Sequence, residues 1–276
     1  MPSTERVSVF IEHGAGGNRV PVVLDADGLS DDEMQSIAQD TGLETAFLLR
    51  SGRPGIDGRL RYWVPNHEMT MCGHATIGTA WVLSRQAGRS DQMFTFDTLA
   101  GLVQAGANVE GGWFEQPEGR VELAAAPLVA LEALGLGEDA LAGLIENATA
   151  PRTKTLVPLR TRRLLDRLDP DQETVRRACD TLGSSGLYPY VVETGSVAHA
   201  RQFPKSSGYR EDPATGVAAA ALFFALRSSG ALDEDQPLTV HQGAAMGRPS
   251  RILVEPTGFS GAPGACRVRG AVHVVG

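Results

Sequence analysis

Two short motifs rich in small residues place ionisable side chains at predicted helix starts. The first is Cys72-Gly73-His74-Ala75-Thr76 and the second is Asp212-Pro213-Ala214-Thr215-Gly216. The free N–H groups in the first turn of a helix carry about half a positive charge, which suits a carboxylate or an enolate-like oxygen. Two such helix ends facing one cleft would form a substrate site that needs neither metal nor cofactor. The alternative is that these small residues only cap and pack their helices.

Other catalytic signatures are missing from the sequence. His67-Glu68 could begin a zinc-protease helix, but position 71 is Met, so the second histidine ligand is absent. There is no Cys-x-x-Cys pair and the six histidines are scattered, so no metal site is expected. The glycine-rich run at 14–18 leads into a predicted strand and not a helix, which argues against a dinucleotide-binding loop. We therefore expect neither a metal nor an organic cofactor.

The elements that position the first motif are predicted from hydropathy patterns. A helix begins at Ser30, because this N-cap residue is followed by acidic residues and by Glu33, which completes a capping box. Residues 73–83 are small or apolar on almost every side, which predicts a helix buried all round. Strands are predicted at 7–11, 20–24, 45–49, 59–64, 93–96 and 101–105.

The second half of the sequence repeats this order. Residues 214–226 predict a second helix that is buried on all sides, and residues 171–182 predict a surface helix. The Ala/Gly/Pro-rich stretch at 111–127 is interpreted as the crossover between the halves. Strands are predicted near 121–123, 154–157, 188–193, 197–203, 238–241, 251–254 and 266–274.

A helix that is apolar on all sides must be covered on all sides, and a curved sheet can surround it. The sequence therefore predicts an α+β fold of two similar lobes, each a rolled β-sheet around a central buried helix, with the active site in the cleft between them. The N-terminal lobe is expected to span 1–113, with the C-terminal strand at 265–276 as a possible addition. The C-terminal lobe is expected to span 118–264.

Composition narrows the function classes. The chain of 276 residues has 33 acidic and 25 basic side chains and a net charge of -8, without a block of Lys or Arg. Such a chain is a poor candidate for binding nucleic acid or an anionic membrane. We expect a small-molecule substrate and a cytoplasmic location. No signal-peptide core is apparent, and the longest apolar run (216–226) falls short of the ~20 residues that span a bilayer. Three cysteines far apart in the sequence suit a reducing compartment.

Seven segments in order along nearly the whole chain resemble the PhzF-like family of phenazine-biosynthesis isomerase-like proteins, which has a diaminopimelate-epimerase-like fold. That family has two similar lobes with the site between them. Besides the two motifs above, the matching segments are Gly17-Asn18 with Pro21-Val22-Val23, Met34-Gln35-x-Ile37-Ala38, Glu44-Thr45-Ala46-Phe47-Leu48, Arg61-Tyr62-Trp63-Val64-Pro65 with Glu68, and Gln242-Gly243 with Met246-Gly247-Arg248-Pro249-Ser250.

The resemblance implies that Glu44 is the proton-shuttling residue and that His74 and Asp212 are also catalytic. Burial between apolar lobes is expected to raise the pKa of Glu44, which would accept a proton from one carbon and return it to another. His74 is expected to be neutral, and Asp212 to orient a substrate amine or hydroxyl, to cap its helix, or both. The expected pocket-lining residues are Asn18, Gly73, Thr215 and Gly216.

Two positions depart from relatives with this fold. In its two-cysteine racemases and epimerases, one thiol lies at each helix start; here Cys72 occupies one place, but Pro213 and Ala214 stand at the other. A same-face proton shift by one carboxylate is therefore favoured, and Cys72, left without a partner, is expected to be dispensable. Val217 stands where family members often have Ala or a small hydroxyl residue, so the substrate is expected to differ from the dihydro-hydroxyanthranilate of the phenazine pathway.

The sequence thus predicts a cofactor-independent isomerase that moves a double bond in a small carboxylate-bearing substrate, anthranilate-like or amino-acid-derived. Secondary metabolism, including antibiotic biosynthesis, is the expected setting, and a homodimer the expected assembly. Two alternatives remain open: an amino-acid epimerase or racemase that uses Glu44 or Cys72 with a second base, and a non-catalytic small-molecule binder of the same fold.

Overall fold

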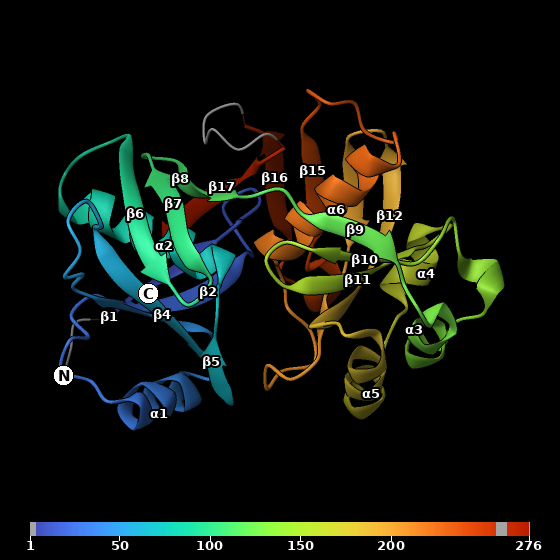
Figure 1. The fold of residues 1–276 in the computed structure, drawn as a ribbon, viewed down its shortest axis with the longest axis horizontal. Helices are drawn as coiled ribbons and strands as arrows, with labels where there is room; N and C mark the ends of the chain where they lie inside the picture. Colours follow the sequence, from blue (N-terminus) through green and yellow to red (C-terminus); the bar gives the residue numbers. More distant parts are fainter. Residues whose placement is uncertain (1–3, 258–263, 276) are drawn as a thin grey trace.

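The computed structural model describes residues 4–257 and 264–275, and many short strands surround two long buried helices (Figure 1). The described part is a strand-rich α+β structure, as predicted. Parts of the expected lobes, residues 1–3, 258–263 and 276, lie outside the described residues. No helix in the described ranges is both long and apolar enough to cross a bilayer.

Eight strands close into a ring around the first buried helix, α2 (Gly73–Gln86). Two of the neighbouring pairs, β2–β3 and β4–β6, are parallel, and the other six are antiparallel. Helix α1 (Asp31–Thr41) covers β3 and β4, and β5 (His67–Met69) extends β4 as a hairpin. In order around the ring, the strands are β1 (Thr4–Val9), β2 (Asn18–Val23), β3 (Thr45–Leu49), β4 (Gly58–Val64), β6 (Gln92–Thr98), β7 (Gly101–Ala107), β8 (Gly111–Gln116) and β17 (Cys266–Val274).

The remaining strands curve around the second buried helix, α6 (Gly216–Ser228), as the right-hand part of Figure 1 shows. They pair in the order β9 (Arg120–Leu123), β10 (Glu146–Thr149), β11 (Thr153–Pro158), β12 (Gly186–Thr194), β13 (Val197–Ala200), β15 (Leu238–Gln242) and β16 (Ser250–Pro256), and β14 (Phe203–Pro204) adds to β12. A separate apolar cluster underlies the outer helices α3 (Pro127–Leu134), α4 (Arg162–Asp166) and α5 (Gln172–Leu182), while short 3-10 turns lie at Glu138–Ala140 and Ala244–Met246.

Strand β17 belongs to both sets of strands. One of its edges pairs with β8, while the other pairs first with β16 and then with β1. The change of partner falls at Gly270, where an added Cβ would lie 2.3 Å from Phe10 Cδ1, so only glycine fits. One apolar cluster also includes residues of both buried helices. The division into lobes at 1–113 and 118–264 stays a prediction.

Most predicted elements are present, with one clear correction. The capping box at Ser30 and Glu33 is formed, and both helices predicted to be buried all round are buried. The stretch at 111–127 does contain the passage from the first set of strands to the second, between β8 and β9, but residues 111–116 form a strand that was not predicted. The glycines there serve close packing and not a turn: an added Cβ on Gly111 would lie 2.1 Å from the carbonyl oxygen of Gly270.

Candidate active site

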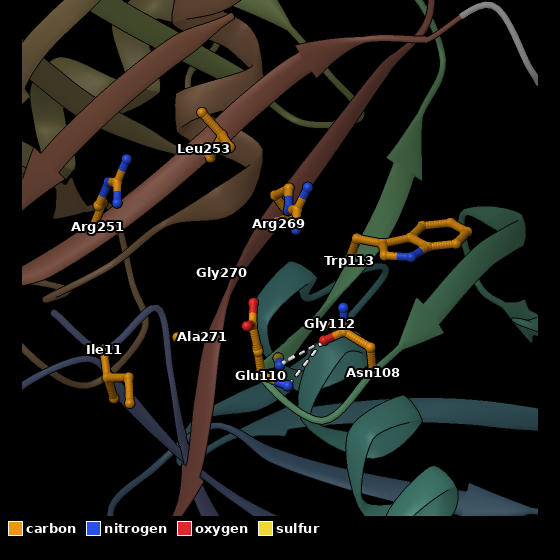
Figure 2. A pocket seen from close by; sticks show the side chains of 11 residues that line it. Ile11, Asn108, Glu110, Gly112, Trp113, Arg251, Leu253, Arg269, Gly270 and Ala271 are labelled. Carbon is orange, nitrogen blue, oxygen red and sulfur yellow. Dashed lines mark hydrogen bonds between the residues drawn. The ribbon is translucent and has the colours of Figure 1, made fainter. Parts of the chain in front are cut away.

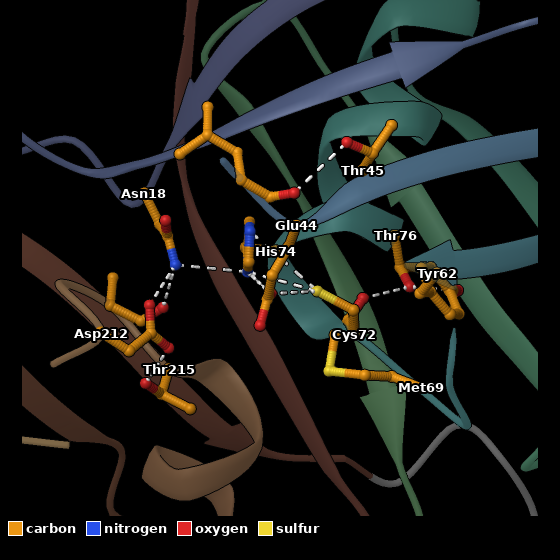
Figure 3. Close-up of polar contacts among 12 residues, drawn as sticks. Asn18, Glu44, Thr45, Tyr62, Met69, Cys72, His74, Thr76, Asp212 and Thr215 are labelled. Carbon is orange, nitrogen blue, oxygen red and sulfur yellow. Dashed lines mark hydrogen bonds and ion pairs between the residues drawn. The ribbon is translucent and has the colours of Figure 1, made fainter. Parts of the chain in front are cut away.

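The starts of α2 and α6 bring the side chains singled out from the sequence into one buried cluster (Figure 3). Asn18, the first residue of β2, lies between Asp212 and His74 in this view. Its Nδ2 donates to Asp212 Oδ1 at 2.6 Å and to the carbonyl oxygen of Ala214 at 3.0 Å, and lies 3.5 Å from His74 Nδ1. Asn18 therefore connects the two helix starts.

The carboxylate of Glu44, directly before β3, has hydrogen bonds at both oxygens. Cys72 Sγ donates to Oε2 at 2.9 Å, and His74 Nδ1 lies 3.3 Å from the same oxygen. Tyr209 Oη donates to Oε1 from the segment that precedes α6, 165 residues further along the chain. Glu44 is thus buried and has a hydrogen-bond donor at each carboxylate oxygen.

The pKa of Glu44 lies below its ordinary value, so the raised pKa predicted from the sequence is wrong. Burial raises the pKa of Glu44, but the attraction of His74 while its imidazole is protonated, the hydrogen bonds from Cys72 and Tyr209 and the charge of Arg152 act in the opposite direction and outweigh it. Burial and the charge of Glu44 raise the pKa values of the Cys72 thiol and the Tyr209 hydroxyl well above their usual ranges. Both groups therefore stay protonated donors, and Glu44 is the ionised acceptor.

Asp212 carries the raised carboxyl pKa in this cluster. Burial and the charge of Glu44 raise the pKa of Asp212 to about 7. The pKa of His74 is lowered, because burial and the charges of Arg248 and Arg152 outweigh the attraction of Glu44. A neutral imidazole is what the sequence predicts for His74. Near neutral pH the site thus holds an ionised Glu44 beside a group, Asp212, that can keep its proton.

Asp212 does not cap α6. The N-cap residue is Thr215, and the Asp212 carboxylate instead accepts hydrogen bonds from Thr215 Oγ1 and from Asn18. The turn is held by Gln242, whose Nε2 donates to the carbonyl oxygen of Asp212 at 2.6 Å and whose Oε1 accepts from the Thr215 N–H at 3.2 Å. The capping alternative for Asp212 is therefore wrong, and its carboxylate is held by side chains.

The glycines that open the two helices have a packing role. An added Cβ at Gly73 would lie 2.6 Å from Phe114 Cε1, and one at Gly216 would lie 3.1 Å from Phe10 Cζ and 3.2 Å from Phe114 Cε1. The buried ring of Phe114 thus lies against both helix starts. Whether Gly73 and Gly216 also line a substrate pocket stays a prediction.

Sequence reasoning missed four contributors to this cluster. Cys72 was expected to lack a second thiol as its partner, and its hydrogen bond to Glu44 was not foreseen. Gln242 belongs to one of the segments that resemble the family, and this position could have indicated a role in the site. Tyr209 and Arg152 carry no motif, and only the fold brings them near Glu44.

The same side chains could hold a metal ion. Glu44, Cys72 and His74 each offer a ligand atom, and these atoms lie within 4.8 Å of one another. Zinc accepts such a set of oxygen, sulfur and nitrogen ligands, but it binds the thiolate. Here the Cys72 thiol is protonated and donates a hydrogen bond to Glu44, so a metal ion would first have to displace the thiol proton. The expectation of no metal stays a prediction.

A surface cavity lies apart from this cluster. It has a volume of about 320 Å³ and is lined by Trp113, Arg251 and Arg269, among others, where β8, β16 and β17 meet (Figure 2). None of the residues of the Glu44–Asp212 cluster lines it. The buried cluster holds ionisable groups with perturbed pKa values, which are typical of active sites.

The ring of strands and the two buried helices form a fold that proline-racemase-like proteins share. A probable proline racemase from Agrobacterium radiobacter shares this fold, with a TM-score of 0.72 at 11% identity over 99% of this chain and 91% of that chain. The chain belongs to the family described as phenazine biosynthesis-like protein, which matches residues 7–275.

Two relatives of this chain are named as isomerases. The uncharacterized isomerase YddE of Escherichia coli is 34% identical over 275 residues, 93% of this chain and 90% of the relative. The trans-2,3-dihydro-3-hydroxyanthranilate isomerase of Pseudomonas aeruginosa is 30% identical over 276 residues, 96% and 94% of the two chains. A PhzF-family structure from Bacillus anthracis has a TM-score of 0.85 at 26% identity, covering 99% of this chain and 96% of that chain. These findings confirm the family read from the motifs and, with it, the enzyme class.

Proposed function

We propose that this isomerase moves a proton, and with it a double bond, within a small carboxylate-bearing substrate, and that Glu44 is its acid–base group. The observation that carries the proposal is that one buried cluster with His74 holds both an ionised Glu44 and an Asp212 that can keep its proton near neutral pH. The substrate would lie between the two helix starts, in a cleft between the two proposed lobes. No metal or organic cofactor enters this proposal.

The chemistry follows from the protonation states. Glu44 accepts a proton from an acidic carbon of the substrate and returns it to another carbon on the same face, so one carboxyl group serves as base and then as acid. Neutral His74, at the start of α2, can hold a hydroxyl or amino group or relay a proton. Asp212 is oriented by Asn18 and Thr215 and can bind a substrate amine or hydroxyl.

An amino-acid epimerase is the second candidate, and the unequal protonation of the two carboxyl groups favours it. An ionised Glu44 and a protonated Asp212 could act as base and acid on opposite faces of one carbon. A thiol pair is excluded from this role, because Cys72 Sγ contacts Glu44 itself and positions 213 and 214 are Pro and Ala. Exchange of the α-proton of a free amino acid in D₂O would distinguish an epimerase from the isomerase.

The test is Glu44→Gln, assayed by NMR for isomerisation and deuterium incorporation with trans-2,3-dihydro-3-hydroxyanthranilate and with related amino- and hydroxy-acids. Gln keeps the size and polarity of Glu but cannot accept the proton, so kcat is expected to fall by at least about 10²-fold. The matched control is Glu132→Gln on the exposed side of α3, which should leave kcat unchanged. Full turnover by Glu44→Gln would refute the proposal, whereas ligand binding without turnover in the wild type would identify a binder.

The biological setting is proposed on the same basis. The P. aeruginosa relative is named for a hydroxyanthranilate isomerisation, and this chain matches 94% of it. A role in secondary metabolite or antibiotic biosynthesis, in the cytoplasm and as a homodimer, is consistent with that relationship. Val217, buried at the start of α6, is proposed to narrow the pocket and shift the substrate away from that of the relative.

A further inference from the structure

Lys154 is a buried cation without a bonded partner. It lies on β11 and is 2% exposed, and its side-chain amino group makes no hydrogen bond or salt bridge with any described residue. Burial and the neighbouring Arg152 lower the pKa of Lys154 to about 7, although Asp212, Cys179 and Glu44 act in the opposite direction. A buried ammonium group is costly unless it is paired.

Gln202 is a second buried polar side chain without a partner. It is 1% exposed, and within the described residues neither its Oε1 nor its Nε2 has a hydrogen bond. Its backbone carbonyl accepts a hydrogen bond from the Asp212 N–H at 3.0 Å, which places Gln202 directly beside the proposed active site. An added Cβ on Gly186 would lie 2.1 Å from Gln202 Nε2, so the amide lies over that glycine.

The strand register brings Lys154 and the Gln202 amide to one place. Strands β11 and β12 are parallel and pair Thr155 with Leu187, so Lys154 lies beside Gly186, under the Gln202 amide. This face of the sheet also carries Leu156 and Tyr188, which belong to the apolar core around α6, whereas alternate residues face the outer cluster.

A third unpartnered donor belongs to Arg152, two residues before Lys154. Its Nε is buried and has no hydrogen bond within the described residues, while its Nη1 contacts Met69 Sδ at 3.3 Å. The charge of Arg152 affects the pKa values of Glu44, Cys72 and His74, so Arg152 lies near the Glu44–Asp212 cluster. Buried polar groups in native proteins are nearly always hydrogen-bonded, and three unpartnered donors therefore indicate a missing acceptor.

We propose that Lys154 and Gln202 bind the carboxylate of the substrate: one oxygen accepts from Lys154 Nζ and the other from Gln202 Nε2. Gln202 Oε1 then accepts from an amine or hydroxyl group next to that carboxylate. The substrate class is thus an amino acid or hydroxy acid held by its acid end while its reacting carbon faces Glu44. This inference rests on the proposed function and adds to it the residues that select the substrate.

The local charges favour a carboxylate over a phosphate. The basic groups Lys154 and Arg152 and the carboxyl groups Glu44 and Asp212 are close enough to affect the pKa of Lys154. A dianionic phosphate would be repelled by these carboxyl groups more strongly than a singly charged carboxylate. The planar carboxylate also suits two donors that come from opposite sides of β12.

The experiment compares two probes that differ at the acid end only. Anthranilate carries a carboxylate and anthranilamide a neutral amide, and calorimetry measures the binding of each to the full-length wild-type protein, to Lys154→Met and to Gln202→Glu. Because a hydrogen bond to a charged group is stronger than a neutral one, Lys154→Met should weaken anthranilate binding by about tenfold or more and leave anthranilamide binding unchanged. Gln202→Glu places its own carboxylate beside Lys154 and should abolish the preference for anthranilate.

The other lysine of the chain provides the control. Lys205 is partly exposed and pairs with Asp180 at 2.6 Å, so Lys205→Met should change neither affinity. Lys154→Met removes an unpaired buried charge and is expected to melt no lower than the wild type, so a folding defect would itself contradict the account.

Each remaining outcome decides between the proposals. If Lys154→Met weakens the binding of both probes equally, or weakens neither, the carboxylate subsite is refuted but catalysis by Glu44 is not. A bound water that satisfies Lys154 and Gln202 would have the same meaning. A wild-type protein that binds neither probe refutes the substrate class of both proposals. Charge-selective binding together with full turnover in Glu44→Gln would support the subsite and refute the proposed function.

Discussion

Replacing Tyr209 with Phe removes one donor from the Glu44 carboxylate and keeps the aromatic ring. The Tyr209 hydroxyl is one of two side-chain donors that stabilise the ionised form of Glu44. Glu44 is proposed to act as a base, so activity is lost as the pH falls through its pKa. Since the hydrogen bond holds that pKa down, its loss raises the pKa, and the acid limb of the kcat/KM profile moves to higher pH.

The size of this displacement follows from the type of bond. A hydrogen bond to a charged group contributes about 1.5–3 kcal/mol, and about 1.4 kcal/mol corresponds to one pH unit. Water that enters in place of the hydroxyl restores part of this, so the acid limb is expected to move up by about one pH unit. At pH values above the limb, kcat should stay within a few fold of the wild type, because the base itself is intact.

The assay is a pH–rate profile of the isomerisation for the wild type, Tyr209→Phe and a control, Tyr190→Phe. Tyr190 is buried on β12, and its hydroxyl has no hydrogen bond to Glu44. The control should retain the wild-type acid limb. An unmoved acid limb in Tyr209→Phe, or a loss of activity that is equal at every pH, would show that the Tyr209–Glu44 bond does not set the protonation of the base.

Four further predictions follow from the same structure. Asp212→Asn should remove an alkaline limb near pH 7 from the rate profile, because the pKa of Asp212 is raised to about 7 and Asn cannot ionise; an unchanged alkaline limb would assign it to another group. Cys72→Ala should move the acid limb upward as Tyr209→Phe does, because the thiol donates to Glu44, and complete loss of turnover would favour a thiol base. Gly111→Ala should lower stability by about 1–3 kcal/mol in denaturant titrations, since its Cβ would lie 2.1 Å from a backbone oxygen, while the open position of Gly28 gives a neutral control. Light scattering at micromolar concentration should give the mass of a homodimer, and a monomer mass would contradict that proposal.

Local patterns were sufficient for the elements that bury the site. The capping box of α1 depends on residues three apart, and the all-round apolar character of α2 and α6 is visible in the sequence. The motifs also singled out Asn18, Glu44, His74 and Asp212, which the fold brings together. The elements, and the grouping of these side chains, could be predicted because each depends on neighbours along the chain or on a run of matched segments; the catalytic roles of the side chains stay predictions.

Long-range contacts account for what was missed. The sequence of β8 predicts a crossover because it is rich in glycine. Those glycines allow close packing against β17, whose residues lie about 150 positions away. The direction of the Glu44 pKa was mispredicted because burial alone was considered, while the donor Tyr209 comes from the far half of the chain. Lys154 and Gln202 carry no motif: the pairing of β11 with β12 brings Lys154 beside Gly186, and an isolated bridge places Gln202 beside Asp212.

The position of β17 has a consequence for how the protein is made. Seven of the eight strands around α2 come from residues 4–116, yet the ring closes only when β17, at 266–274, pairs with β1 and β8. During synthesis the first buried helix must therefore wait, incompletely covered, for almost the whole chain to leave the ribosome. Pairing between strands so distant in sequence slows folding and leaves apolar surface open to aggregation. Nascent chains arrested before β17 should accordingly depend on chaperones in a way that the finished protein does not.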